Sequence, residues 1–475
     1  MSFTSLLMSF SRTVFANNPA RLLAACLLAG CSKEIPAAPA PIIPPVAGTP
    51  TPQYGTPFTG VPNREDAVIY QVNMRAFSQT GNFAGVTARL DSIKAVGVNV
   101  LYLMPIYPVG ALRGVNSPYA VRDYRAVNPE FGTLADLRTL VDAAHARGLA
   151  VVLDWVANHT AWDNAWITDH PDWYLQNGTT IQSPPNTNYT DVAQLNFNNA
   201  AMRLEMISAM KSWVFTANVD GFRCDYSDAP AITPTSFWQQ AVDTLRNVKS
   251  HKLLLLAEGN RSSNFISGFD YNYGFSFYDA LKRVYSSGGA ATYFDALNAN
   301  EYAGATGTQQ VVRYTTNHDV NGSDGTPIAL FGGNAGAMSA FVVASCYRGV
   351  PMVYNGQEAG MTTGIPFPFT SVKVAWGAHP DVTRAYKQLL AARAASAALR
   401  HGTPTSYSSA TVCAFTKTAG PEQAFVLANV RNTATTYTLP TALASSTWTN
   451  ALQGGTVVLG TQVTLPAYGY MVLKK

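Results

Sequence analysis

The chain has 475 residues, of which 47% are hydrophobic and 13% are charged, and its formal net charge is +4. This composition is typical of a soluble globular protein with room for one large domain and a small one. The sequence has no Lys/Arg run and no basic stretch interleaved with aromatic residues, so nucleic acid is not an expected partner.

The five cysteines form neither a disulfide pattern nor a metal-binding pattern. Cys26 and Cys31 lie near the N-terminus, whereas Cys224, Cys346 and Cys413 are widely spaced along the body of the chain. Metal-binding cysteines usually occur in close pairs such as CxxC, and none is present. We expect Cys224 to be a small buried residue and not a reactive thiol.

Residues 1–31 have the pattern of an export signal. Two arginines precede an apolar run at 22–28, which is too short to span a bilayer. Leu28–Cys31 resembles a bacterial lipobox, in which the cysteine is lipidated; the alternative is a plain secretory signal with an unrelated cysteine. Residues 32–62 are rich in Pro, Ala, Thr and Gly and are predicted to form an extended tether. We therefore expect an exported bacterial lipoprotein, periplasmic or on the cell surface, that is anchored to the membrane through Cys31.

Beyond this tether, short apolar segments alternate with amphipathic helical patterns. Strands are predicted at 67–74, 99–105, 149–156, 221–225, 252–259, 269–272 (weak), 311–317 and 350–354. Helices are predicted at 87–96, 134–147, 201–216, 236–249, 335–346 and 383–399. Apolar strands that alternate with helices indicate a parallel sheet covered by helices.

Eight such units over roughly 330 residues favour a (β/α)8 barrel. The alternative, an open doubly wound sheet, is disfavoured because no glycine-rich turn of the dinucleotide-binding type follows the first strand. The long polar segment 159–199 predicts a small inserted subdomain after the third strand. Only about ten residues separate the fifth and sixth strands, too few for a full crossover helix. Alternating Thr/Val/Tyr-rich stretches predict a C-terminal antiparallel β-sandwich at 401–475, after a barrel at 63–400.

The predicted fourth strand carries two charges near its end, Arg223 and Asp225. Side chains alternate between the faces of a strand, so these two residues point to the same side. A neighbouring cation lowers the pKa of a carboxyl group, and we therefore expect Arg223 to keep Asp225 ionised, as suits a nucleophile. A purely structural ion pair is the alternative explanation.

Polar residues end three further apolar strands. They are Asp154 to His159 after the third strand, Glu258 after the fifth, and Asn317 to Asp319 after the seventh. Active sites of parallel barrels lie at the carboxyl ends of the strands, so these groups should meet. Taken singly, an Asp at a strand end is more often a helix cap and a His is more often a neutral structural residue. Four such endings at one barrel mouth favour a catalytic site, because unpaired buried carboxylates are costly.

Here the sequence closely resembles the α-amylase family of glycoside hydrolases (family 13) over nearly all of residues 65–475. The four short family regions correspond to 154–159, 221–228, 257–259 and 315–319, in the expected order. Further matching segments are 98–105, 191–196 and 349–358, and residues 117–124 with 127–133 resemble the tyrosine loop of the family. The resemblance implies the barrel predicted above and a glycosidase.

By this resemblance, Asp225 is the nucleophile, Glu258 is the general acid/base, and Asp319 grips sugar hydroxyls and stabilises the transition state. Retaining glycosidases place an ionised and a protonated carboxyl group about 5 Å apart. Glu258 ends a strongly apolar strand, where a carboxyl group keeps its proton longer. The resemblance also implies that His159 and His318 hydrogen-bond the sugar next to the cleaved bond, with Tyr119 stacked on its ring.

No cofactor is implied for the chemistry, but many members of the family bind a structural calcium ion. The resemblance places one ligand at Asn158, a second at the position of Asn196, which is often Asp, and a third at a carbonyl that would be that of Ala229. A Lys-His pair that also binds sugar in typical amylases is replaced by Asp228 and Ala229. Calcium is therefore weakened as an expectation, and the leaving-group specificity is left open.

The activity expected from the resemblance is hydrolysis of α-1,4-glucans or maltooligosaccharides with retention, as in starch degradation. An α-glucan transglycosylase, or a hydrolase of α-1,6 linkages or short α-glucosides, would use the same residues. A non-catalytic surface glycan-binding lipoprotein is an alternative of another class. It predicts the loss of at least one of the three carboxylates, and all three are present. We expect a monomer.

Overall fold

The computed structural model describes residues 51–229 and 233–475. The predicted signal peptide, Cys31 and residues 32–50 of the predicted tether lie outside the described residues. Within the described part of the chain, no helix has both the length and the apolar character needed to cross a membrane.

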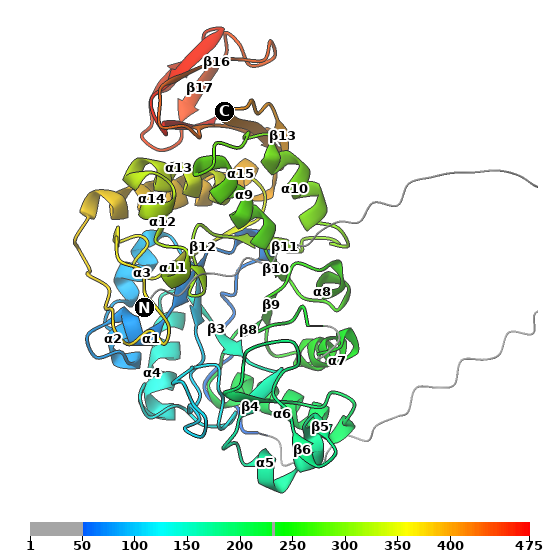
Figure 1. The fold of residues 1–475 in the computed structure, drawn as a ribbon. Coiled ribbons are helices and arrows are strands. Elements are labelled where there is room, and N and C mark those ends of the chain that lie inside the picture. Colours follow the sequence, from blue (N-terminus) through cyan, green and yellow to red (C-terminus); the bar gives the residue numbers. More distant parts are fainter. Residues whose placement is uncertain (1–50, 230–232) are drawn as a thin grey trace, which may run out of the picture. The chain divides into compact units, whose positions relative to one another are not determined.

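Eight parallel strands close into a barrel, in the order β1-β12-β11-β10-β9-β8-β3-β2 (Figure 1). Their bounds are β1 Ile69–Val72, β2 Val100–Leu103, β3 Ala150–Trp155, β8 Gly221–Cys224, β9 Leu254–Ala257, β10 Tyr271–Tyr273, β11 Gln310–Arg313 and β12 Val350–Tyr354. Each overlaps a predicted strand, including the weak sixth one. The (β/α)8 prediction is confirmed, and the open doubly wound alternative is wrong because β1 pairs with both β2 and β12.

Helices surround this barrel (Figure 1). Their bounds are α1 Met74–Phe77, α2 Phe83–Thr87, α3 Leu90–Val96, α4 Leu134–His145, α6 Ala200–Thr216, α7 Thr235–Arg246, α8 Ser262–Ile266, α9 Phe275–Tyr285, α10 Tyr293–Glu301, α11 Val320–Ser323, α12 Pro327–Leu330, α13 Gly333–Cys346, α14 Pro380–Ala394 and α15 Ala397–His401. The short α8 fills the connection that was predicted to be too small for a full helix. The predictions missed α9 and α10.

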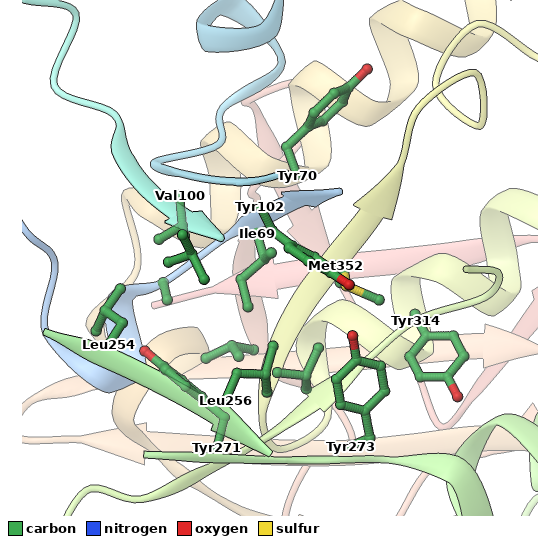
Figure 2. Packing of buried hydrophobic residues seen from close by; sticks show 14 of the residues in the cluster. Ile69, Tyr70, Val100, Tyr102, Leu254, Leu256, Tyr271, Tyr273, Tyr314 and Met352 are labelled. Carbon is green, nitrogen blue, oxygen red and sulfur yellow. The ribbon is translucent and has the colours of Figure 1, made fainter. Parts of the chain in front are cut away.

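The side-chain alternation of the strands gives the barrel an apolar interior with a polar layer above it. Ile69, Val100 and Leu254 face the interior together with Tyr102 and Leu256, and Figure 2 shows them meeting inside the barrel. Two residues further along their strands, the same face carries polar side chains. These are Gln71 after Ile69, Asp154 after Val152 and Glu258 after Leu256, with Arg223 at the equivalent level of β8. The polar layer therefore lies directly beyond the apolar core, at the carboxyl ends of the strands.

The predicted insertion after the third barrel strand is a small subdomain. It contains β4 His159–Ala161, α5 Trp166–Asp169, η2 Pro171–Trp173, β5 Gln176–Asn177, β6 Thr180–Ile181 and β7 Val192–Gln194. β4 pairs antiparallel with β7, so His159 lies opposite Gln194. This ribbon carries the segment between β6 and β7 to the mouth of the barrel.

The C-terminal part forms two antiparallel sheets, as predicted. One has the order β13-β14-β15-β20-β17-β18 and the other pairs β16 with β19. The bounds are β13 Thr403–Ser406, β14 Val412–Ala419, β15 Glu422–Asn429, β16 Thr435–Thr438, β17 Thr447–Asn450, β18 Thr456–Val458, β19 Gln462–Leu465 and β20 Tyr470–Lys474. Alternate residues of β14 serve two cores, because Val412 and Ala414 pack inside this domain while Cys413 and Phe415 join the core of the barrel.

The last part of the predicted tether packs against the barrel. This part precedes the short helix η1 Arg64–Asp66. Val61 is buried, and Phe58 stacks on His145 with ring centroids 4.3 Å apart. Tyr54 donates a hydrogen bond to Asp142. Aromatic and branched side chains in this segment can bury apolar surface, which a Pro/Ala/Thr-rich chain cannot.

Candidate active site

A cavity of about 670 Å³ opens at the carboxyl ends of the barrel strands. Six of the residues predicted from the sequence line it: Tyr119, His159, Asp225, Glu258, His318 and Asp319. The other two predicted residues, Arg223 and Asn158, are fully buried. The barrel thus brings together side chains from five separate connections.

Arg223 lies at the centre of the buried charges. Its Nη1 donates to Asp154 Oδ1 at 2.8 Å and to Asp225 Oδ1 at 3.0 Å, and its Nη2 lies 2.5 Å from Glu258 Oε1. The predicted same-face contact between Arg223 and Asp225 is therefore present. One guanidinium group is shared by three carboxylates.

The pKa of Asp225 departs from the expectation. Burial raises the pKa of Asp225 to about 7, and the charge of Arg223 only partly offsets this effect. Burial also raises the pKa of Glu258, well above its ordinary value, and again Arg223 opposes the shift. The sequence argument considered the neighbouring cation and left out the loss of water, which is the larger effect here. That Asp225 loses its proton before Glu258 stays a prediction.

Tyr119 and His318 form one unit at one side of the cavity. Their rings stack with centroids 5.4 Å apart, and the Tyr119 hydroxyl lies 2.5 Å from His318 Nε2 and 3.1 Å from Asp154 Oδ2. Gln71 Nε2 donates to His318 Nδ1 at 2.7 Å, so the neutral ring carries its proton on Nε2. Burial lowers the pKa of His318 and favours this neutral form. His318 Nε2 also lies 3.2 Å from Asp319 Oδ1.

The side chain of His159 is held by that of Asn158. Asn158 Nδ2 lies 3.2 Å from His159 Nδ1 and 3.1 Å from Gln194 Oε1. Burial lowers the pKa of His159 to about 4, so the ring is neutral near pH 7. The insertion is thereby connected, through β7, to a side chain of the cavity.

Several residues of the site were not selected from the sequence. Asp154 was noticed at its strand end, but its role as the partner of Arg223 and Tyr119 was not. Gln71 is the only polar residue of β1 that faces the interior, which is a signal that sequence reasoning could have used. Tyr189 and Phe367 also line the cavity, and they come from loops that carry no recognisable motif.

The residues around Asn158 do not fit a calcium ion. Asn158 Oδ1 accepts from the Thr233 hydroxyl at 2.9 Å, and the carbonyl of Ala229 accepts from the Thr233 amide at 2.6 Å. Asn196 Oδ1 accepts from the backbone of Asn198. Each of the three oxygens that the resemblance assigned to the ion already accepts a hydrogen bond within the protein, and none of the three belongs to a carboxylate. Across residues 51–229 and 233–475, no group of three or more His, Cys, Asp or Glu side chains could hold a metal ion.

The arrangement suits chemistry at an electron-poor carbon next to a departing oxygen. An ionised Asp225 can attack such a carbon, and a protonated Glu258 can donate to the oxygen. Asp319 is half-exposed at the cavity wall, where it can accept hydrogen bonds from hydroxyl groups of a ligand.

Comparison with known proteins agrees with this geometry. The model of a family described as "Alpha amylase, catalytic domain" matches residues 63–191 and 185–419. The alpha-amylase MalA of Haloarcula japonica is 29% identical over 312 residues, covering 62% of this chain and 44% of that protein. An oligo-1,6-glucosidase of Halalkalibacterium halodurans is 31% identical over 197 residues, 34% of each protein. The chain thus spans less than half the length of these two relatives. The crystal structure of an alpha-amylase from Lactobacillus plantarum superposes with a TM-score of 0.75 at 29% identity, covering 86% of this chain and 99% of that one.

Removal of divalent cations should leave the fold intact, because the oxygens around Asn158 are already bonded within the protein. We expect the same melting temperature in excess calcium and in excess chelator, measured by circular dichroism. The side chain of Gln194 bonds to the side chain of Asn158 and donates to the carbonyls of Asn158 and Leu195. Gln194→Ala removes these hydrogen bonds and should lower the free energy of unfolding by about 2–4 kcal/mol. A clear fall in melting temperature on chelation of the wild-type protein would contradict this interpretation.

Proposed function

Because the chain belongs to the α-amylase family of glycoside hydrolases, we propose that it hydrolyses α-1,4-linked glucans or maltooligosaccharides with retention of configuration. One observation carries the proposal: Asp225 and Glu258 line the same cavity while both contact Arg223. This arrangement supplies the ionised and the protonated carboxyl group that a retaining glycosidase needs.

In the first step, Asp225 attacks the anomeric carbon while Glu258 gives its proton to the departing glycosidic oxygen. The bond to the leaving sugar breaks, and an ester forms between Asp225 and the retained sugar. In the second step, Glu258 takes a proton from water, whose oxygen attacks the same carbon and releases Asp225. Two inversions give net retention.

The surrounding residues hold this pair and the retained sugar. Asp154 fixes the guanidinium of Arg223, which in turn contacts both acids. The stacked rings of Tyr119 and His318 form a wall that can pack against a sugar face, and Asp319 accepts from its hydroxyl groups. These positioning roles follow from contacts that exist before any substrate binds.

A transglycosylase would use the same two steps, with a sugar hydroxyl in place of water. The similarity to an oligo-1,6-glucosidase makes hydrolysis of α-1,6 linkages a second candidate. A non-catalytic glycan-binding protein is disfavoured, because all three carboxylates face the cavity. Reducing-sugar release from starch and from linear maltooligosaccharides tests the proposal. A folded protein without activity on any α-glucan would contradict the proposed function.

We also infer that the chain is exported and anchored to a membrane through a lipid on Cys31, which rests on the sequence of residues 22–31. Expression in a bacterial host with radiolabelled palmitate should give a labelled protein in the membrane fraction. Cys31→Ser should lose the label, and Cys26→Ser, a matched control in the same segment, should keep it. Label retained by Cys31→Ser would contradict the inference.

Substitution of either acid should remove the activity without removing the fold. We expect Asp225→Asn and Glu258→Gln each to lower kcat on maltooligosaccharides by several orders of magnitude, with unchanged circular dichroism. Fluoride leaves without a proton, so Glu258→Gln should lose much less activity than Asp225→Asn when an α-glycosyl fluoride is the substrate. Near-full activity in either variant on maltooligosaccharides would show that the roles are wrongly assigned.

The pH dependence of kcat/KM should be bell-shaped. The rate should rise with pH as Asp225 loses its proton, with a midpoint near 7, and should fall at higher pH as Glu258 loses its own. The charge of Asp154 is one cause of the raised pKa of Asp225, so Asp154→Asn should move the lower midpoint to more acidic pH. Asp91→Asn, at an exposed position outside the cavity, should leave both midpoints in place. An unmoved acid limb in Asp154→Asn would contradict this electrostatic account.

A further inference from the structure

A buried arginine outside the catalytic charge cluster binds two loops of the cavity. Arg75 lies in α1, directly after β1, and its side chain is 3% exposed. An arginine that is withdrawn from water needs acceptors for its N–H groups and a compensating negative charge, because the loss of either is costly. Its partners therefore indicate which parts of the structure it holds.

All five N–H donors of Arg75 are used. Nε donates to Glu130 Oε1 at 2.9 Å and Nη2 donates to Glu130 Oε2 at 2.8 Å, which gives an ion pair with two hydrogen bonds. Nη2 also donates to Asn116 Oδ1 at 2.9 Å. Nη1 donates to the carbonyl of Asn116 at 2.8 Å and to that of Pro368 at 3.0 Å. A planar guanidinium can serve these acceptors at once, which the single ammonium group of a lysine cannot do.

The two loops that Arg75 joins lie at the active-site cavity. Asn116 belongs to the loop after β2, and Pro368 belongs to the loop after β12. Among the described residues, no hydrogen bond joins one loop directly to the other. Each of the two bonded residues lies between residues that line the cavity: Val115 and Ser117 in the first loop, and Phe367 and Phe369 in the second.

Val115 and Phe367 form the outer rim of the cavity. Their side chains are 53% and 52% exposed, whereas His318 is buried. The rings of Phe367 and Phe369 have centroids 5.7 Å apart, and Phe369 in turn lies 6.2 Å from His318. A single sugar ring beside His318 therefore need not reach the rim. Further rings of a longer chain extend towards the cavity mouth, where the rim lies.

The inner part of the same wall has hydrogen bonds of its own. The hydroxyl of Tyr119 lies within hydrogen-bond distance of Asp154 and His318. The next residue, Ala120, accepts from the amide of Gly110 at 2.9 Å. Loss of the contacts made by Arg75 should therefore loosen the rim and leave Tyr119 in place.

From these contacts we propose that Arg75 is a positioning residue, which links the loop after β2 to the loop after β12 and so fixes the rim for sugar rings beyond the one bonded to Asp225. The inference rests on the proposed function. The backbone of Asn116 supports it, because a φ of 60° lies in the left-handed region, which residues other than glycine seldom adopt. Two hydrogen bonds from Arg75 hold Asn116 in this conformation.

The test compares a substrate that has one sugar ring with a substrate that has several. α-Glucosyl fluoride occupies only the site beside Asp225, whereas maltopentaose also extends along the rim. For the full-length protein, Arg75→Lys keeps the charge and removes the planar fork. It should lower kcat/KM on maltopentaose roughly tenfold, mainly through a higher KM, and leave kcat/KM on the fluoride unchanged within about twofold.

Glu130→Gln is a second variant that removes no buried group, because the side chain of Glu130 is 40% exposed. It should change the ratio of the two kcat/KM values in the same direction as Arg75→Lys. If Arg75→Lys does not fold, the ratio in Glu130→Gln decides.

Arg393→Lys is the matched control. Arg393 is also fully buried, donates to the carbonyls of Glu65, Ser345 and Gly349, and lies outside the cavity. Both lysine variants should lower the melting temperature, measured by circular dichroism. Arg393→Lys should nevertheless leave the ratio of the two kcat/KM values unchanged.

Two results would overturn the proposal. A loss on the fluoride that equals or exceeds the loss on maltopentaose would show a general structural role for Arg75. No loss on either substrate would show that the rim does not depend on this link. A folded wild-type protein that acts on neither substrate would refute the proposed function itself, so the two failures are distinguishable.

Discussion

A single buried cation, Arg223, is the constraint on which the site depends. It contacts Asp154, Asp225 and Glu258, so one positive charge faces three largely buried carboxyl groups. Full ionisation of all three would leave two uncompensated negative charges buried, which is costly. The cluster must therefore hold a proton near neutral pH. Burial raises the pKa of both Asp225 and Glu258, so the proton is shared within this pair of carboxyl groups.

The packed interior of the barrel holds this charge cluster in place. Strand alternation sends Ile69, Val100 and Leu254 into a packed interior, and the next inward position on each strand lies two residues closer to solvent. Polar side chains thus appear only at the carboxyl end, where the strands diverge into loops. The lower layers hold the strands in register, and this register places Asp154 beside Arg223.

The eight strands and the three acids could be predicted from the sequence, because buried strands give continuous apolar segments and the acids sit at fixed positions after them. Helices α9 and α10 were missed, although the buried residues Phe277, Leu281 and Val284 of α9 have helical spacing. Loop residues such as Tyr189 were missed for a different reason: local sequence does not specify which distant loops fold over a barrel mouth. The pKa of Asp225 was misjudged because a neighbouring charge is visible in sequence, whereas burial is not.

Residues 226–229 and Thr233 connect two departures from the family pattern. Thr233 donates to the side chain of Asn158 and to the carbonyl of Ala229, and so joins the β8 loop to the insertion by hydrogen bonds. Asp228 in the same segment is bonded to the loop that follows Glu258. Residues that could have held an ion or a sugar hydroxyl are instead committed to supporting the acid and the insertion.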